Sequence, residues 1–555
     1  MVGNIIAMMA NILCYRYKIM ITKIVLFLGV ILLLTCCNIQ KGKELSASYS
    51  TTYQNPMKWA DIPDMSITRN GDDYYLISTT MHLMPGAPVM HSKDLVNWGM
   101  ASYVFEKLED TPKYDLLQGT VYGRGQWASS IRYYKGKYYV LFSPNDQPYR
   151  SYIYESNDPI KGSWKLLSRM KHFHDASLFF DDDGRVYVFS GTGSLRELKE
   201  DLSDVKPQGI DMKFFERDDT ETGLLEGSQV IKHNGKYYVL MISWPNGKPR
   251  RQVVYRADYI TGPYEKRVIL QDNFADFPYA GQGCIIDDKY GNWYGLIFQD
   301  RGAVGRVPLL MPVQWQDNWP MLGDLNNKVP NQGVIPLKTF KPKNDIVQSD
   351  DFDSNTLGLQ WQWNHNPQNN YWSLKERKGH LRLKTNRIVP NLYLAPNSLT
   401  QRMTGPISEG AIKIDLKNMS EGDVSGLSAF NGHSAILEIS KENNSKYLIM
   451  STNVVNLSAD NKEVISVDRT EHEKIKLATE VIYLKIKGDF NLGKDIATCY
   501  YSLDNKNWNK IGVDFKMQFD YKKLFMGSKF MIFNYATKNL GGFVDVDWFN
   551  YTKFN

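Results

Sequence analysis

Short apolar stretches rich in aromatic residues run through most of the chain, and glycine or Asx turns separate them. Tyr138 to Phe142 (YYVLF) follows the turn glycine Gly136, and Gly410 to Leu416 (GAIKIDL) shows alternating apolar and polar positions. Such runs are typical of β-strands. The period of 3.6 residues that marks amphipathic helices is almost absent. The pattern therefore predicts an all-β protein.

One hairpin signature, a turn glycine followed by an aromatic strand, occurs five times. The second aromatic residue of the signature falls at positions 75, 139, 187, 238 and 294, so the intervals are 64, 48, 51 and 56 residues. Repeats of this size with several strands each indicate propeller blades. We expect a five-bladed β-propeller over residues 53–340.

Polar residues recur at one phase of this repeat. Counting back 12 residues from the aromatic position, or 11 in the shorter first unit, gives Asp64, Trp127, Asp175, Glu226 and Gln282. Equivalent positions of successive blades point the same way, so these side chains should converge on the propeller axis. Buried charges are costly without partners. Three carboxylates at a phase where a core would use Val or Ile therefore predict a functional site.

Two carboxyl groups on either side of a sugar bond can hydrolyse it, because one protonates the leaving oxygen while the other activates water. A third acid can orient its neighbour and tune its pKa. Trp127 offers a flat apolar face for a sugar ring. A single Asp is more often a salt-bridge or turn residue, but three acids at one repeat phase favour catalysis.

The stretches around these residues resemble glycoside hydrolase family 43, which contains inverting β-xylosidases, α-L-arabinofuranosidases and arabinanases. The resemblance implies Asp64 as general base, Asp175 as the acid that tunes and orients, and Glu226 as general acid. It also implies that Arg306 contacts the bound sugar. The matching stretches are Trp59 to Ile67 (WADIPDMSI), Gln126 to Ser130 (QWASS), His174 to Phe179 (HDASLF), Leu225 to Ser228 (LEGS), Gly302 to Arg306 (GAVGR) and Pro312 to Pro320 (PVQWQDNWP).

Asp61 is the main alternative to Asp64 as the general base, but its position in the repeat should direct its side chain away from that of the other site residues. Met81 and His82 follow the second strand of the first blade and are expected to line the sugar pocket, although packing is an equal alternative for Met81. His172 and His174 alternate without a third metal ligand and are interpreted as strand residues.

No metal or other cofactor is expected to be required. Gln282 stands where many members of the family carry a His that helps to hold an axial calcium ion, so an axial metal is not expected. Acids near both ends of the second half of the chain could bind a structural calcium ion, so calcium there stays an open alternative.

The second half of the chain should form a separate domain. Residues 341–349 (KPKNDIVQS) are mostly polar and are interpreted as a linker, and residues 350–555 as a β-sandwich. The opening Asp350 to Ser354 and the closing Asp545 to Phe549 resemble the concanavalin A-like module that follows the propeller in β-xylosidases of this family. A sugar-binding module and a stabilising cap are the alternatives.

The N-terminal segment reads as a leader. Met20 to Lys23 makes a normal signal opening, so the residues before it are expected to be an upstream extension. Ile24 to Leu34 is an apolar run that ends at Thr35 and two cysteines. It is too short to span a bilayer comfortably and resembles a lipoprotein signal peptide. We expect residues 1–36 to be removed, lipidation at Cys37 with Cys36 as the alternative, and a tether over 37–52.

Composition adds two limits. The chain has 555 residues, and its net charge of +6 is spread thinly, so no nucleic-acid partner is expected. Contact with a membrane is expected only through a lipid anchor, with the exported protein on a bacterial outer membrane, facing the periplasm or the cell surface.

The leading hypothesis is an exo-acting, inverting glycosidase that removes xylosyl or arabinofuranosyl residues from plant hemicellulose oligosaccharides. The alternative is a non-catalytic carbohydrate-binding lipoprotein on the same propeller. A retaining fructan hydrolase is a third hypothesis, but its expected nucleophile and acid motifs are absent from the sequence.

Overall fold

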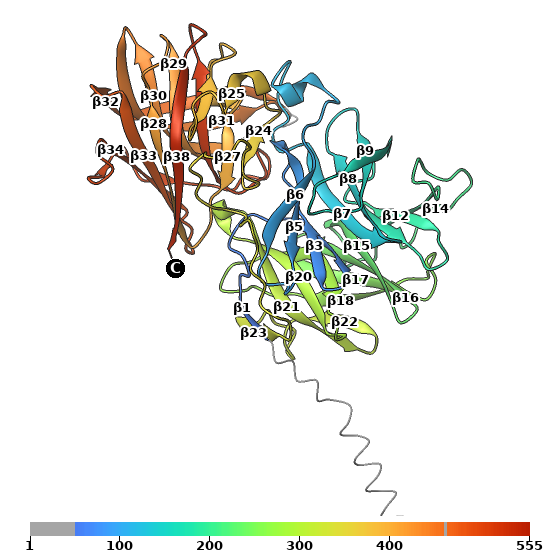
Figure 1. Ribbon diagram of the computed structural model, residues 1–555. Coiled ribbons are helices and arrows are strands. Elements are labelled where there is room, and N and C mark those ends of the chain that lie inside the picture. Colours follow the sequence, from blue (N-terminus) through green and yellow to red (C-terminus); the bar gives the residue numbers. More distant parts are fainter. Residues whose placement is uncertain (1–49, 460–462, 555) are drawn as a thin grey trace, which may run out of the picture. The chain divides into compact units, whose positions relative to one another are not determined.

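Five antiparallel four-stranded sheets follow one another along the first part of the chain in the computed structural model, which describes residues 50–459 and 463–554 (Figure 1). The first strands of neighbouring sheets contact one another, so each sheet is one blade around a central axis, and the predicted five-bladed propeller is confirmed. The strands are, in blade 1, β2 (Ser66–Asn70), β3 (Asp73–Ile77), β5 (Gly86–Ser92) and β6 (Gly99–Phe105); in blade 2, β7 (Gln126–Tyr134), β8 (Lys137–Pro144), β9 (Arg150–Ser156) and β10 (Lys165–Lys171); in blade 3, β11 (Ser177–Phe180), β12 (Val186–Ser190), β13 (Ser194–Leu198) and β14 (Asp211–Lys213); in blade 4, β15 (Leu224–His233), β16 (Lys236–Trp244), β17 (Arg251–Ala257) and β18 (Glu265–Leu270); and in blade 5, β19 (Ala280–Asp287), β20 (Trp293–Asp300), β21 (Arg306–Gln316) and β22 (Trp319–Leu322).

The repeated aromatic position marks the second strand of every blade, as the spacing predicts. Tyr75, Tyr139, Tyr187, Tyr238 and Tyr294 lie in β3, β8, β12, β16 and β20. Tyr187 and Tyr238 are completely buried, and the others are buried to different degrees. Large flat side chains at this position fill the wedge between neighbouring blades. Much of the aromatic content of the propeller is therefore structural.

A half-buried guanidinium group ties the inner strands together near the axis. Arg132 on β7 donates hydrogen bonds to the Ser66 hydroxyl of blade 1 (3.2 Å), the Ser177 hydroxyl of blade 3 (2.6 Å) and the Val230 carbonyl of blade 4 (3.3 Å). Burial lowers the pKa of Arg132 to about 10. The same strands carry the predicted acids, because Ser66 and Ser177 each lie two residues beyond one of them.

The two ends of the propeller meet in a small sheet of their own. The strand β1 (Thr51–Gln54) pairs antiparallel with β23 (Gln332–Ile335), which follows the fifth blade. Thr51 and Thr52, the last two residues of the range expected to be a tether, thus belong to a strand. The expected linker is packed as well, because Ile346 and Val347 are buried in the same hydrophobic cluster as Tyr53 of β1.

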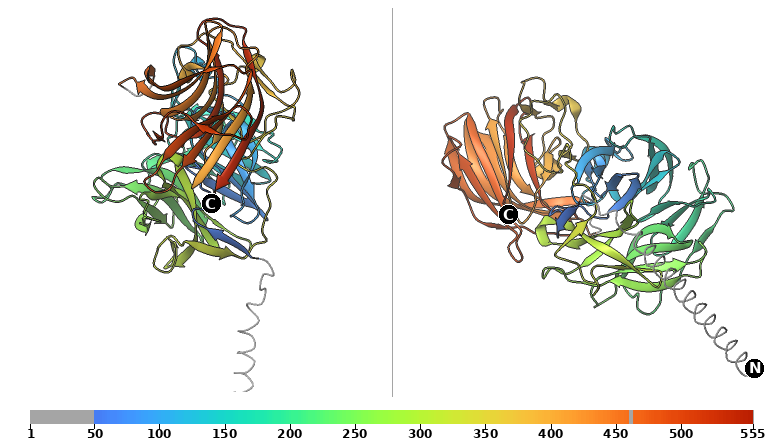
Figure 2. Two further views of the ribbon diagram at one scale, coloured as in Figure 1. Left: turned by 90° about the vertical axis from the view of Figure 1, so that its left-hand side faces the viewer. Right: turned by 60° about the horizontal axis from the view of Figure 1, so that its bottom comes forward.

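The remaining strands form two sheets that lie face to face over a shared hydrophobic core, drawn in yellow, orange and red (Figure 2). The predicted β-sandwich is confirmed. One sheet has the order β32-β31-β30-β29-β37-β27-β24-β4 and the other β25-β26-β38-β28-β33-β34-β35, with β36 beside β34. These elements are β4 (Leu83–Met84), β24 (Gln362–Asn364), β25 (Trp372–Ser373), β26 (Leu381–Lys384), β27 (Leu399–Arg402), β28 (Ile407–Asp415), β29 (Asp423–Phe430), β30 (His433–Glu442), β31 (Ser445–Leu457), β32 (Val464–Leu477), β33 (Val481–Asp489), β34 (Ile496–Ser502), β35 (Asn509–Lys510), β36 (Phe515–Lys516), β37 (Lys529–Ala536) and β38 (Phe543–Phe554), with short 3-10 turns at η1 (Pro112–Asp115), η2 (Gly302–Val304), η3 (Asn369–Tyr371) and η4 (Leu392–Leu394).

The edge strand β4 belongs to the propeller part of the chain. It lies between β3 and β5 of blade 1 in sequence, and Met84 and Leu83 pair with Trp363 and Asn364 of β24. A backbone ladder thus joins the first blade to the sandwich. The loop that carries β4 is therefore joined to blade 1 at its two ends and to the sandwich through β4.

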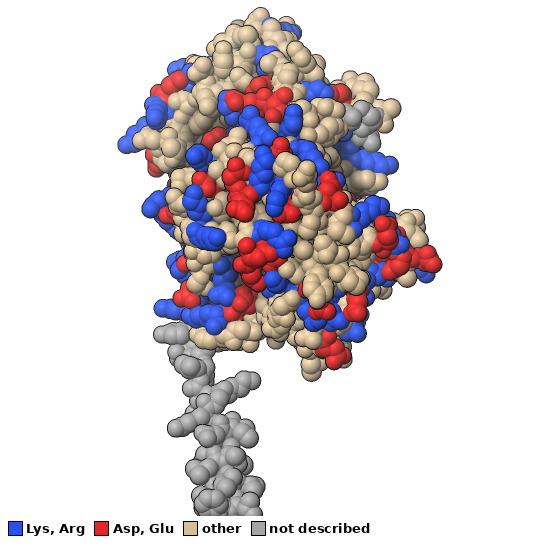
Figure 3. Space-filling view, turned by 90° about the vertical axis from the view of Figure 1, so that its right-hand side faces the viewer, with Lys and Arg blue, Asp and Glu red and all other residues tan. Residues whose placement is uncertain are grey.

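Charge and membrane features of the described residues are plain. On the face drawn in Figure 3, Lys and Arg side chains are interspersed with Asp and Glu rather than gathered by sign. Among residues 50–459 and 463–554, no helix has the length and apolar character needed to cross a membrane. The expected leader, with Cys36 and Cys37, lies outside the described residues.

Candidate active site

The five residues of the polar repeat phase all lie at the same end of the inner strands. Asp64 and Asp175 precede β2 and β11, whereas Trp127, Glu226 and Gln282 lie near the starts of β7, β15 and β19. Asp64 and Asp175 thus stand just before the inner strands rather than on them. Asp64 and Asp175 have φ of 54° and 45°, a left-handed conformation that costs energy for residues other than glycine and often marks functional sites.

The other three residues lie at β-bulges. The pairing register shifts between Gln126 and Ser129, between Glu226 and Gln229, and between Ala280 and Gly283. A bulge adds an unpaired residue that redirects a side chain. In blade 4 it depends on Gly227, whose φ is 72° and where a Cβ atom would lie 2.8 Å from the Gln282 side chain. The repeat therefore positions this ring of side chains by backbone irregularity rather than by strand alternation.

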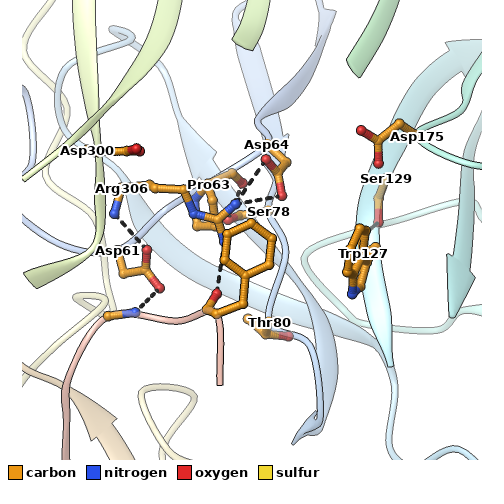
Figure 4. A network of polar contacts seen from close by, with 12 residues as sticks. Asp61, Pro63, Asp64, Ser78, Thr80, Trp127, Ser129, Asp175, Asp300 and Arg306 are labelled. Atoms are coloured by element: carbon orange, nitrogen blue, oxygen red, sulfur yellow. Dashed lines mark hydrogen bonds and ion pairs between the residues drawn. The ribbon is translucent and has the colours of Figure 1, made fainter. Parts of the chain in front are cut away.

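Asp64 is buried against a cation. Nη1 of Arg306 lies 3.3 Å and 3.4 Å from its two carboxylate oxygens (Figure 4). Burial raises the pKa of Asp64 above its ordinary value of 3.8, while the Arg306 charge works against that rise. Arg306 therefore helps to keep a buried carboxylate in the charged form.

Asp61, the rival to Asp64, has a structural role. One of its carboxylate oxygens accepts the backbone N–H of Arg306 at 2.9 Å, and the other accepts the backbone N–H of Gly527 at 2.8 Å. The first donor belongs to the propeller and the second to the sandwich. Both oxygens of Asp61 are thus engaged in joining the two domains, which leaves Asp64 as the carboxylate that faces the site.

The other two acids form a cluster with a histidine. Nε2 of His174 lies 3.0 Å from the Glu226 carboxylate and 4.0 Å from that of Asp175. Burial and the Glu226 charge raise the pKa of Asp175 to about 7, although the His174 charge opposes this. Burial lowers the pKa of His174, but the hydrogen bond to Glu226 and the Asp175 charge outweigh it and raise the value to about 9. The cluster therefore holds protons around neutral pH.

His174 was expected to be an ordinary strand residue, and that interpretation is wrong. It lies in the turn before β11, next to the left-handed Asp175. The turn directs its ring toward the neighbouring blade and Glu226. Adjacency to Asp175 was the only signal in the sequence.

Metal binding differs between this cluster and the axis. His174, Asp175 and Glu226 each offer a ligand atom within 4.8 Å of the others, so together they could hold a divalent cation. The axis near Arg132 does not fit a cation, because the half-buried guanidinium supplies a positive charge there. The side chain of Gln282 packs on Gly227.

Two aromatic side chains from different domains wall the site. Trp127 donates its indole N–H to the Gly123 carbonyl, and its ring lies 5.7 Å from His174 and 5.9 Å from Phe525. Phe525 belongs to the sandwich, precedes β37 and has its ring 4.4 Å from the Arg306 guanidinium. Its carbonyl also accepts a hydrogen bond from Nη2 of Arg306. Repeat phase could not reveal Phe525, because it lies outside the propeller sequence.

Met81 and His82 were expected to line the sugar pocket, with packing as an equal alternative for Met81. Both are buried, so the structure corrects the expectation for His82 and fits the packing alternative for Met81. Met81 is buried and exchanges two backbone hydrogen bonds with Gln126. His82 is completely buried, with its ring 4.8 Å from Tyr122 and 5.1 Å from His365 of the sandwich. The pairing of β4 with β24 draws this loop into the domain interface. Both residues support the site without a surface for sugar.

The geometry brings a base candidate, Asp64, and an acid candidate, Glu226, to one end of the propeller axis. Asp175 lies near both, since each of their charges raises its pKa. Paired carboxyl groups beside an aromatic wall are suited to glycoside hydrolysis. No nucleophilic Ser or Cys arrangement is needed for that chemistry.

Comparisons with known proteins agree with this geometry. Residues 53–320 match the model of Glycosyl hydrolases family 43, and residues 349–552 match the Beta xylosidase C-terminal Concanavalin A-like domain. The chain is 29% identical over 560 residues to a beta-xylosidase of Formosa agariphila, covering 90% of each. It is 28% identical to a non-reducing end alpha-L-arabinofuranosidase of Bacteroides ovatus, covering 68% of this chain and 73% of the relative.

Solved structures give the same result. A bifunctional GH43-CE protein of Bacteroides eggerthii is 41% identical with a TM-score of 0.83, and the match covers 91% of this chain but 64% of that longer chain. An engineered GH43 enzyme described as having endo-xylanase and exo-arabinofuranosidase activity is 28% identical with a TM-score of 0.83, covering 91% of this chain and all of that one. Family model, relatives and site geometry agree that this chain is a glycosidase and belongs to glycosyl hydrolases family 43.

Proposed function

We propose that the protein is an exo-acting, inverting glycosidase that removes xylosyl or arabinofuranosyl residues from hemicellulose oligosaccharides. One observation carries this proposal: Asp64 and the Asp175–His174–Glu226 cluster lie at the same end of the propeller axis. The names of relatives, beta-xylosidase and alpha-L-arabinofuranosidase, support the sugar class.

In the proposed reaction, the Asp64 carboxylate takes a proton from water as that water attacks the anomeric carbon. The bond from the anomeric carbon to the leaving oxygen breaks, and Glu226 gives its proton to that oxygen. Single displacement inverts the anomeric configuration. The Arg306 charge beside Asp64 keeps the base ionised despite its burial.

No metal takes part in the proposed steps, so the protein is expected to stay active in the presence of EDTA. Loss of activity in EDTA would contradict this part of the proposal.

Asp175 and His174 are proposed to keep a proton available to the general acid, Glu226. Two carboxyl groups close together cannot easily ionise at once, so the cluster keeps a proton available near neutral pH. The positive charge of His174 limits this effect, since it lowers the pKa of Asp175.

The mature protein is proposed to be exported and held at a bacterial outer membrane by lipid on Cys37, or on Cys36 if processing occurs one residue earlier. The support is the apolar run from Ile24 to Leu34 followed by the two cysteines. A lipid anchor would place the enzyme near large oligosaccharides outside the cytoplasm.

Replacing the acid should make the rate depend on the leaving group. Glu226→Gln should lower kcat/KM by about 10²–10⁴-fold on an aryl glycoside whose phenol needs protonation, but far less on a dinitrophenyl glycoside. Asp64→Asn should slow both substrates, because water activation is needed in each case. Equal losses of Glu226→Gln on the two substrates would contradict the assignment of the acid.

Removing the histidine charge should move the basic limb of the pH profile. His174→Asn takes a positive charge away from Asp175, so the pKa of that carboxyl rises. The cluster then keeps its proton to higher pH, and the basic limb of kcat/KM should shift upward by about one unit. An unchanged or lowered basic limb, measured with purified protein, would show that His174 does not control the proton.

Lipidation can be tested by detergent partition. The full-length protein, expressed in a bacterium that processes lipoproteins, should enter the detergent phase of Triton X-114, and Cys37→Ser should enter the aqueous phase. Cys36→Ser is the matched control. If Cys36→Ser alone abolished partition, the lipid would be on Cys36, and if neither change mattered, the anchor proposal would be wrong.

A further inference from the structure

A hollow of about 710 Å³ lies at the junction of blades 4 and 5. We call it the rim hollow and define it by Leu224, Trp244, Arg250, Asn273 and Tyr279. None of these residues belongs to the catalytic group described above.

The rim hollow borders the site on the side of the acid. Leu224 begins β15 two residues before Glu226, and their cross-strand partners on β16 are Trp244 and Ile242. Two residues of a strand span about 7 Å and share a face, a distance comparable to the length of a sugar ring. In blade 5, Tyr279 lies three residues before Gln282. Residues of the hollow thus stand two and three positions before the site residues Glu226 and Gln282.

Two aromatic rings form its wall, and a buried cation fixes them. The rings of Trp244 and Tyr279 are 4.9 Å apart, and the Arg250 guanidinium lies 4.8 Å and 5.2 Å from their centres. Arg250 is only 8% exposed. It donates hydrogen bonds to the Tyr279 carbonyl and the Asp300 carboxylate, both at 2.9 Å. The wall is thus held in place before any ligand arrives.

The hollow also has the surface chemistry of a sugar site. Tyr279 is 37% exposed and Trp244 partly exposed, so their faces can meet the apolar side of a pyranose ring. Asn273 and Lys248 also line the hollow and supply polar groups beside the aromatic wall. Aromatic surface with a few polar groups is typical of specific small-ligand sites.

We propose that the rim hollow binds the leaving-group part of the substrate, the sugar units that follow the scissile bond. This rests on the proposed function, because it requires Glu226 to protonate the leaving oxygen. The leaving group must then pass Glu226, and the rim hollow begins beside that residue. On the base side, Phe525 covers Arg306, so the acid side is the route for a longer chain.

The test compares two kinds of leaving group. Trp244→Ala should lower kcat/KM by about tenfold on xylo-oligosaccharides or arabinoxylan oligosaccharides, since remote contacts contribute to transition-state binding. The same variant should stay within about twofold of wild type on aryl β-xyloside or aryl α-L-arabinofuranoside, whose leaving group carries no sugar. Tyr279→Asn should behave alike, and Asn suits the φ of 68° at that position.

Tyr290→Ala is the matched control, because Tyr290 is 51% exposed in the turn at the far end of the first blade-5 strand. It should leave both substrates unaffected. Equal rates of wild type and both hollow variants on every oligosaccharide would overturn the proposal, and so would equal losses on aryl glycosides and oligosaccharides. A wild-type protein that cleaves no glycoside would instead overturn the proposed function, and the rim hollow with it.

Discussion

The structure depends on a half-buried charge near the axis of the propeller. Arg132 reaches from blade 2 to hydrogen-bond partners on blades 1, 3 and 4. A half-buried guanidinium that no carboxylate of the described residues pairs with is costly, and desolvation lowers its pKa accordingly. Its hydrogen bonds offset that cost only while the inner strands keep their mutual positions. Ser66 and Ser177 are two residues from Asp64 and Asp175, so the same contacts help to fix the positions of these two carboxylates relative to each other.

The site sits on this fixed ring but is not made of regular structure. Asp64 and Asp175 adopt left-handed turns, and Glu226 lies at a bulge supported by Gly227. Such irregular backbone costs stability, and surrounding contacts must hold it. The sandwich provides part of that support, because Asp61 accepts one N–H from each domain and Phe525 covers Arg306. The second domain is therefore a component of the active site.

Repeat spacing predicts the blades and the catalytic phase because both follow from local sequence. A turn glycine and an aromatic strand recur once per blade, and residues at one phase of a closed ring must converge. Contacts between the domains could not be predicted in this way. His82 and Met81 lie in a stretch whose sequence indicates a loop at the surface, yet pairing of β4 with β24 buries them. Phe525 contacts Arg306 across 219 positions of sequence, and His174 enters the site only because the turn at Asp175 has positive φ.

The central claim is that Asp64 activates water for a single displacement while Glu226 protonates the leaving group. The most direct test is proton NMR of the first sugar released from an aryl β-xyloside, before mutarotation equilibrates the anomers. Single displacement predicts that α-xylose appears first, and for an aryl α-L-arabinofuranoside that the β-anomer does. First appearance of the anomer present in the substrate would require a covalent intermediate, and it would contradict the assignment of Asp64 as a base.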